Sequence, residues 1–205
     1  MRRSLSVSLA VLCVLLALPR AARAQIGKAV RIAAGSPEDQ LVLAINAATT
    51  NAEKIALLDK YMADNGKSEM AIVALEQYVA IYSADKNYEK AFQYGDQGLA
   101  ADPDNYGIAY AMFRAAQDKG DVEREFHYGE ALAGIMARYK AQAAPQGEDA
   151  DSWAARKKQT LADIAEGMNY VSASLFNAAR GAQDPKVQVA LLERYAIAFA
   201  DSTYA

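Results

Sequence analysis

The chain has 205 residues, of which 53% are hydrophobic and 23% charged, and its formal net charge is −3. This length fits one domain or one short array of repeats. Its single cysteine, Cys13, excludes a disulfide framework and a thiolate zinc site. The first 24 residues hold four of the 22 basic residues and none of the 25 acidic ones, so the remainder carries −7. Nothing in that remainder resembles a basic surface for a phosphate backbone, which argues against a nucleic-acid partner.

Residues 1–24 are predicted to be a signal peptide. Arg2 and Arg3 precede a nearly continuous apolar run over residues 5–18, and Ala22-Arg23-Ala24 supplies the small residues of a cleavage site. The apolar run is short for a permanent membrane span, although an uncleaved anchor is the alternative. We expect cleavage after Ala24, a periplasmic or secreted protein without a stable membrane span, and a flexible lead-in over residues 25–35.

The remaining chain reads as a series of helices. Ser36 and Pro37 mark a helix start, and Thr50 with Glu53 forms a capping box for the next helix. Proline, glycine and acids interrupt the helical pattern at residues 143–151, which are predicted to be a loop. The expected helices cover 36–48, 50–64, 69–84, 87–101, 105–119, 121–142, 152–181 and 184–201.

Two segments 34 residues apart are closely related. Residues 87–96 read NYEKAFQYGD and residues 121–130 read DVEREFHYGE. Self-similarity at this period is typical of stacked helical hairpins. Phe92 and Phe126 occupy the same position in the two segments, so we expect equivalent core roles for them. Tyrosines are expected in the core as well, because most of them fall at positions where the repeat family that this period resembles buries an aromatic residue; they include Tyr78, Tyr82, Tyr88, Tyr94 and Tyr128.

The period and its turn residues resemble the tetratricopeptide repeat (TPR) family, whose unit is a 34-residue helix-turn-helix. The clearest likeness covers residues 72–139. Ala91, Pro103 and Gly120 match the alanine, late proline and mid-repeat glycine of that family, while Lys86 and Glu125 depart from its pattern. The resemblance implies an all-α, TPR-like solenoid over residues 36–205: a right-handed superhelical array of eight helices in four antiparallel hairpins, at about 37–64, 69–101, 105–142 and 152–201.

The two ends of the chain also repeat each other. Residues 55–61, IALLDKY, correspond to residues 189–195, VALLERY. The last helix pair therefore repeats the first pair. In the first pair, the helix at 37–48 is the first helix of its hairpin, so the helix that ends at 181 must also be the first helix of its hairpin. Two antiparallel helices separated at Gly167 would make it a second helix. We therefore predict one continuous helix over 152–181.

In TPR proteins the first helix of each hairpin lines a concave groove that binds a protein or peptide. The resemblance therefore implies a non-catalytic scaffold with such a partner, and the predicted signal peptide leads us to expect it in the cell envelope. Some cytosolic members bind a C-terminal carboxylate through lysines and asparagines at these positions. Here the positions hold Glu76, Ala80 and Tyr110, which argues against that class of ligand. Arg114, beside Tyr110, either binds one acidic or aromatic group of a ligand or is simply a polar residue on the surface of the groove. The groove residues implied by position are Val73, Glu76, Ala80, Ser83, Gly107, Tyr110, Arg114 and Gln117.

Other candidate sites have simpler structural explanations. Trp153, beside the long loop, either packs under that loop or anchors a partner. The single histidine, His127, cannot form a multi-histidine zinc site and is expected on an outer helix. The sequence shows no motif for a metal or cofactor, and none is expected. The alternative function, a small hydrolase or polysaccharide-processing enzyme on the same scaffold, requires a buried acid with a raised pKa in a cleft.

Overall fold

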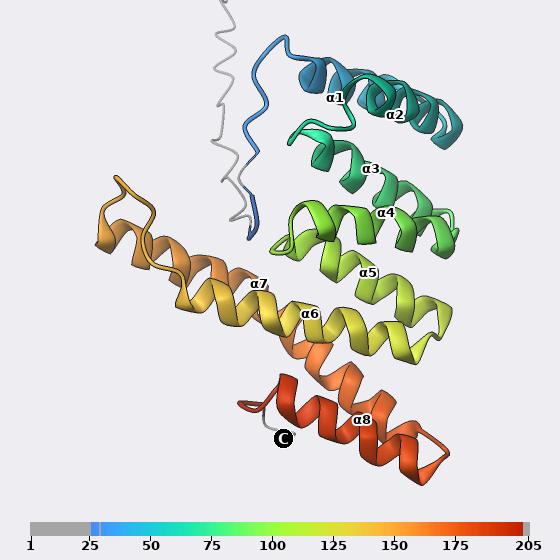
Figure 1. The fold of residues 1–205 in the computed structure, drawn as a ribbon, viewed down its shortest axis with the longest axis vertical. Helices are drawn as coiled ribbons and strands as arrows, with labels where there is room; N and C mark the ends of the chain where they lie inside the picture. The colour runs from blue at the N-terminus through green and yellow to red at the C-terminus, as the bar shows by residue number, and fades with distance from the viewer. Residues whose placement is uncertain (1–25, 29, 203–205) are drawn as a thin grey trace, which may run out of the picture.

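The computed structural model describes residues 26–28 and 30–202, which form eight helices and contain no strand (Figure 1). The predicted signal peptide and its cleavage site lie outside these described residues. The helices are α1 (Pro37–Ala47), α2 (Asn51–Asn65), α3 (Ala71–Ala84), α4 (Tyr88–Ala101), α5 (Tyr106–Lys119), α6 (Val122–Ala141), α7 (Ala150–Gly181) and α8 (Pro185–Ala198).

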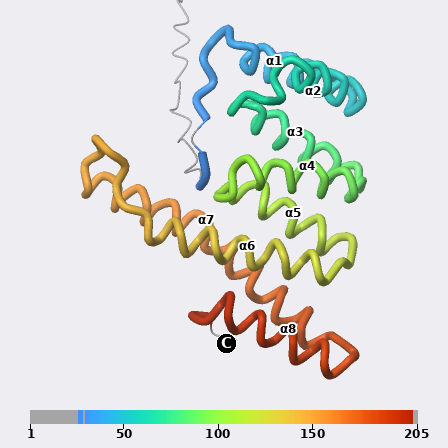
Figure 2. Tube along the Cα trace, viewed as in Figure 1, coloured from blue at the N-terminus to red at the C-terminus, as the bar shows by residue number. Residues whose placement is uncertain are grey.

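The helices pair in chain order into four hairpins. Figure 2 shows α1 and α2 at one end of the molecule, and α8 with the C-terminal half of α7 at the other, with the two middle hairpins between them. Each helix packs mainly on its neighbours in the chain, as in a solenoid. The predicted all-α helical-hairpin array is therefore confirmed.

The 32-residue helix α7 is continuous through Gly167, as predicted. It begins at Ala150 because Asp149 is its N-cap: the Asp149 carboxylate accepts a hydrogen bond from the Ser152 amide at 2.9 Å. The sequence predicted a loop up to residue 151 and a helix from residue 152, so the loop ends earlier than expected. The C-terminal half of α6 and the N-terminal half of α7 extend beyond the other hairpins (Figure 1).

The turns inside the two middle hairpins explain one departure from the repeat pattern. Gly120 ends α5 with a left-handed φ of 75°, where glycine costs nothing. Lys86 occupies the same place after α3 and adopts a φ of 56°. The left-handed turn is thus kept without its glycine, and the Asn87 amide donates to the Tyr82 carbonyl at 2.8 Å.

The repeated aromatic residues form the centre of the array. Phe92 and Phe126 are both buried, which confirms their equivalence, and Phe92 stacks on Tyr128 at a centroid distance of 5.9 Å. Tyr78 stacks on Tyr94 at 4.1 Å. Of the five tyrosines expected in the core, Tyr78, Tyr82 and Tyr128 are buried, whereas Tyr88 and Tyr94 are half-buried.

Candidate functional site

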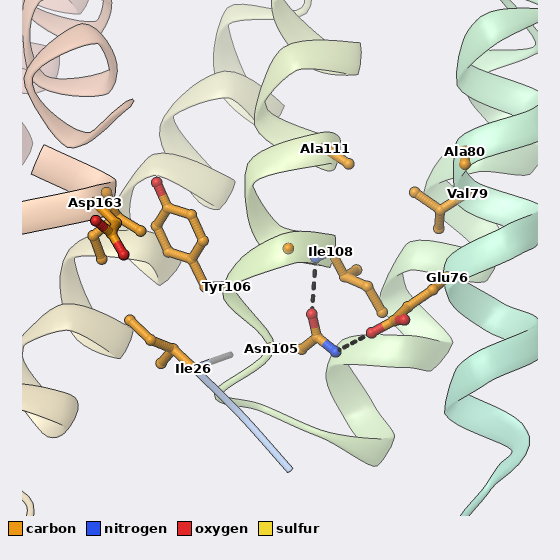
Figure 3. Close-up of a pocket in the computed structure, with 11 residues that line it drawn as sticks. Ile26, Glu76, Val79, Ala80, Asn105, Tyr106, Ile108, Ala111 and Asp163 are labelled. Atoms are coloured by element: carbon orange, nitrogen blue, oxygen red, sulfur yellow. Dashed lines mark hydrogen bonds between the residues drawn. The ribbon is translucent and has the colours of Figure 1, made fainter. Parts of the chain in front are cut away.

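A hollow of about 880 Å³ opens between α3, the start of α5 and the middle of α7 (Figure 3). Its described lining is mostly apolar, with carboxylates from Glu76 and Asp163 and no basic side chain. Burial raises the pKa of Tyr106 to about 12, so its phenol is neutral. The lining residues are Ile26, Glu76, Val79, Ala80, Asn105, Tyr106, Gly107, Ile108, Ala111, Asp163 and Ile164.

Asn105 organises one side of the hollow. It is the N-cap of α5, and its buried side chain accepts from the Ile108 amide at 2.9 Å. The same side chain donates to a Glu76 carboxylate oxygen at 2.8 Å (Figure 3). Glu76 was predicted as a ligand-contacting residue, and the structure shows that it also positions the cap of the next repeat.

The lead-in segment borders the same hollow. Ile26 is only 4% exposed, and its carbonyl accepts from the Tyr106 amide at 3.3 Å. The Lys28 amide donates to Asp102 at 2.8 Å. Gly27 has a φ of 116°, and a Cβ there would lie 2.6 Å from an Asp102 oxygen. The sequence predicted a flexible lead-in, but residues 26–28 are held against the α4–α5 turn by these contacts.

Three of the predicted groove residues lie against α7. The Arg114 guanidinium stands 4.8 Å from the centre of the Tyr170 ring, and the Tyr170 hydroxyl donates to Gln117. A Cβ at Gly167 would come within 3.5 Å of the Tyr110 ring. Tyr110, Arg114 and Gln117 are consequently half-buried, because the middle of α7 packs over this part of α5.

The remaining predicted groove residues are divided between surface and core. Ala80 and Gly107 are exposed and line the hollow, whereas Val73 is buried. Ser83 is half-buried, and its side-chain oxygen has no hydrogen-bond partner within the described part of the chain. Contact of these residues with a ligand stays a prediction.

Trp153 packs under the loop, the first of the two roles considered from the sequence. Its ring is buried edge-on against Tyr139 at a centroid distance of 5.9 Å, and its indole nitrogen donates to the Gln142 carbonyl at 3.3 Å. Lys157 also donates to that carbonyl. Trp153 therefore closes the tip of the α6–α7 extension. His127 is exposed on α6, as expected for an outer helix.

Only part of this site is recognisable from the sequence. Asn105 follows a proline-containing turn and is recognisable as a helix cap. Ile26 and Asp163 lie far from the α3–α5 repeats in sequence, and no local pattern brings them to the hollow.

The alternative enzymatic function requires a buried acidic side chain. Glu125 on α6 is such a side chain. Burial raises its pKa, and a hydrogen bond from Gln117, at 3.5 Å, opposes the rise. Glu125 occupies the place of the packing alanine in the repeat pattern. It lines neither the hollow described above nor two further hollows near Asp102 and Phe199.

The raised pKa of Glu125 predicts a pH-dependent cost to folding. The folded state holds the proton more tightly than the unfolded state, so stability falls as pH rises from the unfolded pKa through the folded one. Glu125→Gln keeps the shape without the charge. We expect it to raise the melting temperature at pH 7 by about 2–4 °C, the shift that accompanies about 1 kcal/mol at this size. Calorimetry should show the gain vanishing near pH 4, and a gain independent of pH would contradict this explanation.

Among residues 26–28 and 30–202, no cluster of three potential metal ligands and no helix long and apolar enough to cross a membrane is found. No family model, curated protein or solved structure matches the chain.

Proposed function

We propose that the chain is a TPR-type, non-catalytic scaffold whose hollow binds an extended segment of another protein. The observation that carries this proposal is the docking of the chain's own residues 26–28 at the edge of the hollow. They bind as a peptide ligand would, through one buried apolar side chain and two main-chain hydrogen bonds, from Tyr106 to Ile26 and from Lys28 to Asp102.

The lining of the hollow suggests which segments fit best. An apolar floor favours a small aliphatic anchor such as isoleucine or valine. Glu76 and Asp163 favour a basic residue near that anchor and disfavour an acidic one. The lead-in itself carries this combination, since Ile26 is followed by Lys28 and Arg31.

A labelled peptide with the sequence of residues 25–32 tests the proposal. In the Ile26→Asp variant the chain's own anchor is removed, so the peptide should bind at least about tenfold more tightly than to the wild type, where the tethered segment competes. Fluorescence anisotropy measures both affinities. A peptide with aspartate in place of its isoleucine should not bind.

Two matched tryptophan variants locate the peptide. Ala80→Trp, made in the Ile26→Asp background, fills the floor of the hollow and should abolish binding. Ala100→Trp places the same ring on an exposed position of α4 and should leave binding unchanged. Equal peptide binding by these two variants would show that the hollow is not the site.

We also propose that the protein acts in the cell envelope after export. This proposal rests on the sequence of residues 1–24 alone. Mass spectrometry of the protein recovered from its host should find Gln25 as the first residue; a mature chain beginning at Met1 would contradict export by cleavage.

A further inference from the structure

The junctions between successive hairpins share one feature. In each, an acidic side chain on the second helix of one hairpin holds a tyrosine or arginine of the next hairpin. Three such pairs occur at the three internal junctions. Asp59 accepts from Tyr78 at 2.5 Å, Asp96 accepts from Tyr128 at 2.7 Å, and Glu130 accepts from Arg194 at 2.7 and 3.0 Å.

The first and last hairpins are structurally equivalent. The Tyr61 hydroxyl donates to Glu38 across α1 and α2 at 2.8 Å. Tyr195 and Ser172 share a hydrogen bond of the same length across α7 and α8, with the same separation of 23 residues. Both pairs are related by the shift that aligns residues 55–61 with residues 189–195, so positions in the two hairpins can be compared one by one.

That comparison shows opposite faces buried at the two ends. Leu58 of α2 is 0% exposed, but its equivalent Leu192 in α8 is half-buried. Leu191 of α8 is 3% exposed, but its equivalent Leu57 in α2 is half-buried. The difference arises because the first hairpin has only a following neighbour and the last has only a preceding one. Each terminal hairpin thus leaves open the face that the other one buries.

The open face of α8 is apolar, whereas terminal repeats of soluble arrays usually present a polar surface. Val189 is 54% exposed, and Leu192, the equivalent of the fully buried Leu58, is only half-buried. Beside them lies Glu193, the equivalent of Asp59 and the fourth acid of the junction series, and it is exposed. At the other end of the molecule, Lys60 is exposed. It is the equivalent of Arg194, the base that donates hydrogen bonds to Glu130.

We infer that these two ends bind each other in different copies of the chain. The last hairpin of one copy stacks on the first hairpin of the next, with Glu193 facing Lys60, and so continues the internal junctions of the array. The partner is a second copy because both halves of the junction, an acid beside apolar residues and a base beside Leu57, are present on one molecule. Since the two faces differ, the contact is heterologous, and repeated stacking gives a ring or a filament.

Charge reversal distinguishes this junction from other association. Sedimentation velocity of the purified protein should show a weight-average mass that rises with concentration. Lys60→Glu places two acids at the junction, and Glu193→Lys places two bases there. Each single variant should associate about tenfold more weakly than the wild type. Both positions are exposed, so circular dichroism should show an unchanged fold.

Mixing the two single variants provides the decisive measurement. Every contact between Lys60→Glu and Glu193→Lys molecules restores one acid opposite one base, so an equimolar mixture should associate as well as the wild type. The double variant should do the same. Lys158→Glu, an exposed reversal on α7, is the control and should associate normally. A protein that is monomeric at every concentration, or association that ignores the single reversals or the mixing, would overturn the inference.

Discussion

Truncating Phe126 to alanine is expected to lower the free energy of unfolding by about 3–5 kcal/mol, the usual cost of deleting a buried phenylalanine ring. Phe126 is fully buried on α6, and the Arg194 guanidinium lies 5.0 Å from the centre of its ring. The truncation would therefore leave a cavity and also uncover the arginine that joins α8 to α6. Both losses act at the junction between the last two hairpins.

The cost is measured by urea denaturation of wild type and variant. Phe92→Ala should cost a similar amount, because Phe92 is the buried equivalent one repeat earlier and carries Arg124 over its ring at 4.3 Å. Val122→Ala, on an exposed position of α6, serves as the control and should change stability by less than about 0.5 kcal/mol. A cost below about 1 kcal/mol for Phe126→Ala would show that its burial contributes little to holding the array together.

The repeated features of the fold could be predicted because each hairpin buries the same positions. The 34-residue shift correctly placed Phe92 and Phe126 in the core. The likeness between the two ends correctly required α7 to be continuous. Helix ends were predicted less well, since a cap such as Asp149 competes with nearby residues of similar chemistry.

The candidate site was harder to predict because two of its parts lie outside the regular repeats. Helix α7 is much longer than the first helix of a standard hairpin, and its middle packs over Tyr110 and Arg114, which positional analogy placed in an open groove. Ile26 is held at the hollow by its main-chain carbonyl, which accepts from the Tyr106 amide, and a bond between two main-chain groups has no signature in the sequence. Analogy between repeats can therefore predict a shared surface, but it cannot tell which of its residues a neighbouring element covers.

Asn105→Ala is expected to have the next largest effect, about 2 kcal/mol of lost stability. The substitution removes the cap from the Ile108 amide, which typically costs about 1 kcal/mol. It also leaves the Glu76 carboxylate without its hydrogen-bond donor beside the hollow, which costs about 1 kcal/mol more. Asn87→Ala is the matched control: Asn87 caps α4 with the same chemistry, but it is exposed and its contact with the Lys90 amide is long, at 3.5 Å. This control should cost about 0.5 kcal/mol, at the low end for a lost cap.

A double-mutant cycle separates the two roles of Asn105. Glu76→Ala removes the carboxylate, so Asn105→Ala should cost less in that background than in the wild type, with a coupling energy of about 0.5–1.5 kcal/mol. The remaining cost is that of the cap alone. If the two substitutions were additive, or if Asn105→Ala cost no more than Asn87→Ala, Glu76 would contribute nothing to the cap. Coupling in the expected range would instead mean that the hydrogen bond between Glu76 and Asn105 stabilises the start of α5. A basic ligand in the hollow would then share this carboxylate with Asn105, so its binding would change the stability of the α4–α5 turn.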